Sequence, residues 1–209
     1  MTASKRTLLV LATVALGLIA FTSVASAQTT DVFRINYISN NVWGAPDATV
    51  RIDNPGVTGG NLCAMIYVFD NDQQLSECCG CLETPNGLRT LSVAKDLTSN
   101  PLTGYVVQNG VLKVVSSAVN NSPCDPSANV APTATLRVWA THIQNPVYAT
   151  AAAATKAKTV ANPSAYPITE TESSNSTLGA TELANIQAEC AFIGILGSGH
   201  GICSCGWGD

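Results

Sequence analysis

The stretch Leu62-Cys-Ala-Met-Ile-Tyr-Val-Phe69 carries no charged side chain, and its interpretation decides the fold. A strand with one face in water alternates apolar and polar residues, whereas this run offers apolar side chains to both faces. The polar residues Asp70-Asn-Asp72 follow it and are typical of a turn. The pattern therefore predicts a central β-strand that is buried on both sides and needs other strands around it.

Shorter strands are predicted on both sides of this run, and 31–38, 47–53 and 134–141 alternate as half-buried strands do. In the first of them Phe33, Ile35 and Tyr37 share one face. The predicted strands are 31–38, 47–53, 88–93, 105–107, 111–115, 134–141 and 168–172. Asn109-Gly110 stands between two β-branched runs, which predicts a tight hairpin there.

One helix is predicted, from about Ala180 to Leu196. Apolar residues recur along it at the spacing of one helical stripe, namely Leu183, Ile186, Cys190 and Ile193. Phe192 and Ile195 widen that stripe, so the second half of the helix is expected to be buried nearly all round.

Together these elements predict an antiparallel β-sandwich, immunoglobulin-like or related, with one C-terminal helix and a disulfide-bonded tail rich in Gly and Cys. The β-sandwich domain is assigned to residues 28–178, with its N-terminal strand at 31–38, and the helix and tail to 179–209. Its expected core comprises Val50, Ile52, Leu62, Ala64, Ile66, Val68, Leu136 and Val138.

Residues 1–27 have the three parts of a secretory signal peptide. Lys5 and Arg6 precede an uncharged apolar run from Leu8 to Phe21, and the small residues Ala25-Ser-Ala27 form the expected cleavage site. The run is shorter than the roughly 20 residues of a membrane-spanning helix. The sequence thus predicts an exported protein whose mature N-terminus is Gln28, without a membrane span after processing.

All eight cysteines follow the predicted signal peptide, and an even number in that context indicates a disulfide framework. They are Cys63, Cys78, Cys79, Cys81, Cys124, Cys190, Cys203 and Cys205. Four intramolecular bridges are predicted. Their connectivity stays open, except that Cys190 is expected to bond to Cys203 or Cys205 because the glycine-rich tail can fold back.

No catalytic, cofactor or metal site is predicted, because each pattern that resembles one lacks a required part. Cys78–Cys81 contains a formal C-x-x-C, but no helix is predicted to begin there, as a redox-active pair would need. His200, Cys203 and Cys205 lack the paired cysteine spacing that is typical of zinc sites. Asp70, Asp72 and Glu77 lack the core of a calcium loop. His142 and His200 are the only imidazole bases, and Ser198 lies in no nucleophile motif.

The acidic balance of the chain argues against nucleic acid as a partner. Its net charge is −4 at pH 7, and loss of Lys5 and Arg6 makes the mature chain still more negative. Binding to a phosphate backbone needs a positive surface, which this sequence does not supply.

Four segments resemble an uncharacterised family of secreted, cysteine-rich bacterial proteins. They are Asn61-Leu-Cys-Ala-Met-Ile-Tyr-Val-Phe-Asp70, Glu77-Cys-Cys-Gly-Cys81, Leu136-Arg-Val-Trp-Ala-Thr-His142 and Cys203-Ser-Cys-Gly206. The resemblance covers most of the mature chain and implies a compartment, but it brings no activity.

The sequence favours a secreted or surface-associated structural or adhesive protein, a filament subunit among the options, without catalysis. Its expected partners are other protein subunits, copies of itself included, or cell-surface components. The expected location is extracellular or on the cell surface, with the periplasm as an alternative. Two other functions stay open: a secreted enzyme acting on surface carbohydrate or peptide, and an extracellular module that binds a small molecule or metal.

Overall fold

The fold is that of a computed structural model, which describes residues 32–39, 47–98, 107, 109–120, 124–133, 135–143, 168–195 and 203–205. The predicted signal peptide, residues 1–27, lies outside the described residues. The elements in chain order are β1 (Phe33–Ser39), β2 (Thr49–Asn54), β3 (Leu62–Asp70), β4 (Leu75–Glu83), β5 (Gly87–Ser92), the π-helical turn η1 (Val93–Leu97), β6 (Asn109–Ala118), β7 (Arg137–Ile143), β8 (Ile168–Glu172), β9 (Ser174–Ser176) and α3 (Ala180–Ile195).

The nine strands of the described residues belong to one sheet, which corrects the predicted β-sandwich. The strand order is β4-β3-β6-β1-β7-β2-β5, with β8 paired to β7 and β9 paired to β1. The sheet curls into a half-barrel of mixed type, because β1 and β7 are parallel where Ser39 pairs with His142. Strong curvature lets a single sheet bury its inner face against itself, so a second sheet is not needed.

The central run behaves as its composition predicts. β3 lies between β4 and β6 and is buried from Leu62 to Val68. Its alternate residues serve two separate cores, since successive side chains of a strand point to opposite faces. All eight residues of the predicted core lie in the first of these, on the inner face of the half-barrel.

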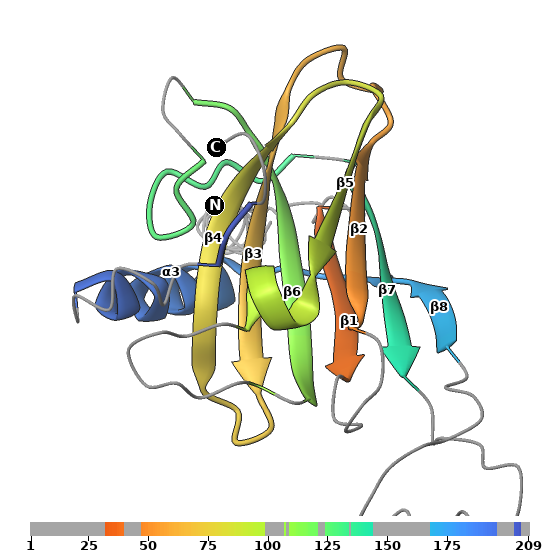
Figure 1. Ribbon diagram of the computed structural model, residues 1–209. Coiled ribbons are helices and arrows are strands. Elements are labelled where there is room, and N and C mark those ends of the chain that lie inside the picture. The colour runs from red at the N-terminus through yellow and green to blue at the C-terminus, as the bar shows by residue number, and fades with distance from the viewer. Residues whose placement is uncertain are drawn as a thin grey trace, which may run out of the picture.

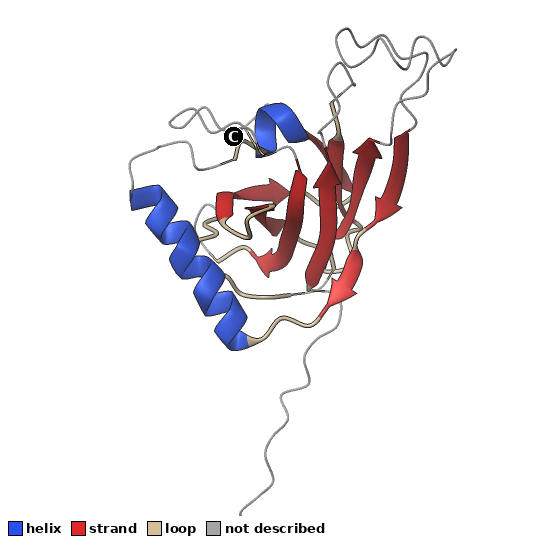
Figure 2. Ribbon diagram, turned by 90° about the horizontal axis from the view of Figure 1, so that it is seen from below, coloured by secondary structure: helices blue, strands red, loops and turns tan. Residues whose placement is uncertain are grey.

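The second core lies on the outer face, under the helix. Phe33, Met65 and Tyr67 from the sheet pack there with Ile186 and Cys190 of α3. Figure 1 shows α3 and η1 on opposite sides of the sheet, and Figure 2 shows α3 running across one side of the molecule. The prediction of the helix is confirmed. The expected burial of its second half on all sides is wrong, because the Phe192 side chain is 61% exposed.

The predicted hairpin at Asn109-Gly110 is wrong. Both residues lie inside β6, where Gly110 pairs with Asp70 of β3 and Ile38 of β1. A Cβ atom on Gly110 would lie 2.0 Å from the carbonyl oxygen of Phe69. Glycine is therefore required here by close approach of the backbones, and the partner strand expected at 105–107 falls mostly on residues that are not described.

Candidate functional site

Three of the four disulfides start from β4, which the sequence did not predict as a strand. Cys78 bonds to Cys190, Cys79 to Cys203 and Cys81 to Cys205. Alternation along the strand sends Cys78 to the outer face and the other two to the inner face. One edge strand thus binds the helix on one side of the sheet and the C-terminal tail on the other.

The position of the helix explains why the pairing predicted for Cys190 is wrong. Cys190 belongs to the core under α3, whereas Cys203 and Cys205 belong to the core inside the half-barrel. The sheet separates them, so Cys190 pairs with the one β4 cysteine that faces outward, Cys78.

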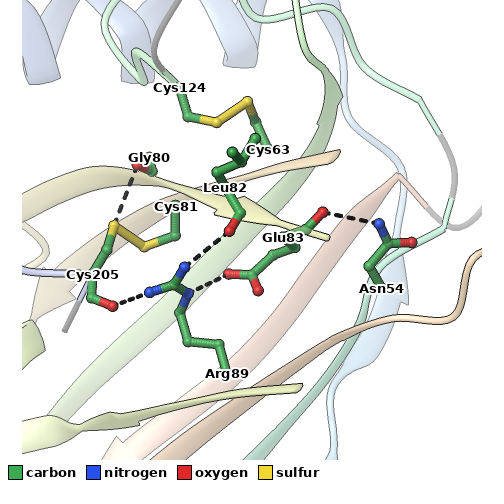
Figure 3. Close-up of polar contacts among 9 residues, drawn as sticks. All are labelled: Asn54, Cys63, Gly80, Cys81, Leu82, Glu83, Arg89, Cys124 and Cys205. Atoms are coloured by element: carbon green, nitrogen blue, oxygen red, sulfur yellow. Dashed lines mark hydrogen bonds and ion pairs between the residues drawn. A yellow bond between two sulfur atoms is a disulfide. The ribbon is translucent and has the colours of Figure 1, made fainter. Parts of the chain in front are cut away.

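The fourth disulfide, Cys63–Cys124, ties β3 to the segment after β6. It draws the backbone of Cys124 against β4, where a Cβ atom on Gly80 would lie 2.0 Å from the Cys124 carbonyl oxygen. Figure 3 shows Gly80 close to the Cys81–Cys205 bridge as well, with the Cys205 sulfur 3.3 Å from the Gly80 carbonyl oxygen. Glycine is therefore required at position 80 by the close approach of Cys124, while its carbonyl oxygen contacts the Cys81–Cys205 bridge.

The tail residues 203–205 connect β4 to the β5–η1 region, and we call this contact the seam. The backbone amide of Ser204 donates to the Asp96 carbonyl oxygen at 2.8 Å. Arg89 of β5 donates through Nη1 to the Cys205 carbonyl oxygen. The tail thus joins the two end strands of the sheet order, since it is bonded covalently to β4 and through hydrogen bonds to Arg89 of β5 and Asp96 of η1.

Arg89 is the central residue of the seam (Figure 3). Its Nε donates to Glu83 Oε1 at 2.6 Å and its Nη2 to the Leu82 carbonyl oxygen at 2.9 Å. The Glu83 side chain is only 3% exposed, and its backbone oxygen accepts from Asn54 Nδ2 at 3.0 Å. A nearly buried carboxylate needs such a partner, because desolvation of an unpaired charge costs several kcal/mol.

An open groove of about 490 Å³ lies along the seam. Its lining includes Glu83, Leu88, Arg89, Lys95, Asp96 and Cys205. The groove is thus lined by acidic and basic side chains, by the hydroxyl groups of threonine and serine residues, and by the exposed Leu88. Such a lining suits a polar, uncharged ligand better than a strongly charged one.

Glu77 is the most unusual titratable residue among those described. It is fully buried on β4, and neither oxygen of its carboxyl has a hydrogen-bond partner in the described part of the chain. Burial raises the pKa of Glu77 to about 8, so the carboxyl is protonated at neutral pH.

The calcium-like pattern of Asp70, Asp72 and Glu77 does not form a calcium-binding loop. The Asp70 carboxylate instead accepts hydrogen bonds from the backbone amides of Asp72 and Gln74 in a turn.

His142 is buried on β7 beside β1. Its ring stacks on Tyr37 with 3.7 Å between centroids, and Nε2 lies 2.7 Å from Thr171 Oγ1. Burial lowers its pKa. The contact therefore joins β1, β7 and β8 through a neutral imidazole, while His200 and Ser198 lie outside the described residues.

Among the described residues, the sulfurs of Cys79, Cys81 and Cys205 lie within 4.8 Å of one another, as metal ligands would. All three are in disulfides, and no cysteine of the chain is free. A disulfide sulfur is not a thiolate ligand. This cluster is therefore a pair of neighbouring bridges, and one of its members, Cys205, lines the groove along the seam.

Comparison with protein-family models, with curated proteins and with solved structures finds no match to this chain. The resemblance to a secreted bacterial family stays a prediction. None of the helices in the described ranges is long and apolar enough to cross a membrane.

Proposed function

We propose that the protein is an exported structural or adhesive protein, whose disulfide-bonded half-barrel is a building unit on the outside of the cell. The observation that carries this proposal is the placement of the disulfides. They connect β3, β4, the segment at Cys124, α3 and the tail, so that covalent cross-links hold together the part of the chain between Cys63 and Cys205. Four bridges are compatible with an oxidising compartment.

The disulfides give such a unit the persistence that an extracellular position requires. They span sequence separations of 61, 112, 124 and 124 residues. Each bridge over a long loop restricts the unfolded chain and stabilises a domain by about 2–5 kcal/mol. The bridges thus protect the domain against unfolding and proteolysis, although only 11% of the residues of the chain are charged. Such persistence suits a structural role.

Native mass spectrometry and negative-stain microscopy of material recovered from outside the source cells test this function. The expected result is a processed chain in assemblies of more than one copy, or bound to surface components. A protein recovered only from the cytoplasm, or one that turns over a surface glycan or peptide, would contradict the proposal.

The groove along the seam favours a second candidate, a module that binds a saccharide. Its mixed charges and hydroxyls can satisfy sugar hydroxyl groups, and the exposed Leu88 offers an apolar surface to a sugar ring. Binding of neutral oligosaccharides, followed by chemical shifts in NMR, tests this candidate. Shifts that centre on the groove and disappear in Lys95→Ala, with the remote Lys113→Ala as control, would support it.

A further inference from the structure

β1 is the first described strand, yet it lies in the middle of the sheet. It pairs with β6 along its whole length, from Phe33 opposite Val115 to Ser39 opposite Asn109. Its other partners are β7 and β9. The strand that follows it in the chain, β2, is not a neighbour, so every strand pairing of β1 joins residues far apart in the sequence.

The place that β1 occupies is specific on both faces. Phe33 is buried in the outer core and Ile38 in the inner core, each 1% exposed. Arg34 donates through Nε to the Leu136 carbonyl oxygen at 3.1 Å and through Nη1 to Asn175. Alternate apolar anchors and polar partners of this kind fix the register of an inserted strand.

A further polar contact binds β1 to the β8–β9 segment. Asn36 Nδ2 donates to the Thr171 carbonyl oxygen at 3.2 Å and to Ser173 Oγ at 3.3 Å. Arg34 and Asn36, two residues apart on β1, thus both donate to residues of the neighbouring segments.

No covalent bridge ties β1 to this place. The first cysteine of the chain is Cys63, and all four disulfides connect residues from there onward. Withdrawal of β1 would break no disulfide, and the bridges would still tie β3, β4, the segment at Cys124, α3 and the tail to one another. Because β1 precedes every other described element, it can leave and enter without threading the chain through a loop.

We propose that β1 is an exchangeable strand, and that its place in the sheet accepts β1 of a second copy of this chain. The proposal rests on the function proposed above, because it supplies the contact by which the units assemble. The second copy makes the same backbone pairing with β6 and presents the same Phe33, Arg34 and Ile38. Since one copy donates what the next accepts, the contact is head-to-tail and builds a chain of units unless it closes into a ring.

Protein concentration decides between the closed and exchanged forms. The exchanged form keeps each contact of β1 and alters only the connection from Ser39 to Thr49. A strand on its own chain competes at an effective concentration on the order of mM. A dilute solution therefore holds monomers, and assembly begins where copies are crowded, as on a cell surface.

Four single cysteine variants test the exchange in the full mature chain. Tyr37 lies opposite Val111 and Ser39 opposite Asn109, all at least partly exposed. Tyr37→Cys mixed with Val111→Cys, and Ser39→Cys mixed with Asn109→Cys, place the new thiols opposite each other only between two copies. Mixing Tyr37→Cys with Asn109→Cys, and Ser39→Cys with Val111→Cys, gives the out-of-register controls from the same proteins.

Each pair is incubated at about 1 mM with sub-denaturing urea, oxidised with glutathione disulfide and separated without reduction. Opposite residues lie about 5 Å apart and diagonal ones about 7–8 Å, so in-register pairs should give about tenfold more covalent heterodimer. Equal yields from matched and mismatched pairs, or no heterodimer from either matched pair, would overturn the exchange. Circular dichroism of each variant first shows that it folds.

The outcomes of this test and of the proposed function are separable. Assemblies recovered from the cell exterior without in-register cross-links would leave the structural function standing and dismiss β1 as the contact. In-register cross-links in a protein confined to the cytoplasm would support β1 as the contact between copies and would contradict the proposed function outside the cell.

Discussion

Gly80 lets the backbone at Cys124, and with it the Cys63–Cys124 disulfide, lie directly against β4. A methyl group there would meet the Cys124 carbonyl at 2.0 Å and its Cβ at 2.8 Å, and backbone cannot yield cheaply. We expect Gly80→Ala to lower the free energy of unfolding by about 1–3 kcal/mol or more, as overpacking does. Chemical denaturation measures this, with Gly60→Ala as the control because nothing lies within 4 Å of its Cβ position. Equal losses in both variants would contradict the account.

Glu77 should make the stability of the protein depend on pH. Its pKa rises from 4.5 in the unfolded chain to about 8 in the folded one, so the folded state holds the proton more tightly. The contribution of Glu77 to stability is therefore greatest below pH 4.5 and falls as pH rises toward 8, by at most about 1.4 kcal/mol per pH unit. Glu77→Gln should remove this decline and stabilise the protein at pH 8.

Urea denaturation across that pH range checks the prediction. Glu182→Gln, on the partly exposed helix surface, is the matched control and should keep the slope of the parent protein. An unchanged slope in Glu77→Gln would show that the buried carboxyl is not the group responsible.

At the scale of elements, Arg89 holds the seam between β4, β5 and the tail. Arg89→Ala would leave Glu83 nearly buried without its cationic partner, and would remove two bonds to backbone carbonyls. We expect a loss of about 3–5 kcal/mol in unfolding free energy. The double variant Arg89→Leu/Glu83→Gln should recover part of it, because no unpaired charge remains; a double variant no more stable than Arg89→Ala would refute this explanation.

The sequence predicts several elements with nearly the bounds that the structure shows. The run 62–69 and the segment 168–172 match β3 and β8 closely, and the helix begins at Ala180 as predicted. β4 was missed because Ser76, Glu77 and Gly80 are poor strand formers, and three cysteines carry no clear alternation. Its strand structure is imposed by β3 and by the disulfides.

The candidate site was less predictable than the elements. Arg89 and Glu83 lie only six residues apart, but their ion pair depends on how β4 and β5 meet across the seam. Glu77 gave no signal of burial, since an acidic residue beside a polar turn is expected in water. The disulfide connectivity depended on which face each cysteine took, and that required β4 to be recognised as a strand.

For the whole molecule, the distribution of the bridges divides the chain into a covalently closed part from Cys63 onward and a β1–β2 part held by hydrogen bonds and packing. That division supports both proposals, because the closed part gives persistence and the open part allows exchange. The proposed structural function requires in addition that the chain is exported, processed and fully oxidised.

The most direct test of this central claim is the intact mass of the protein recovered from outside the cell, measured without reduction. The account predicts one species that begins at Gln28 and is eight hydrogens lighter than the reduced chain, since all eight cysteines are bridged. A chain that keeps residues 1–27, or that retains two or more free thiols, would contradict it.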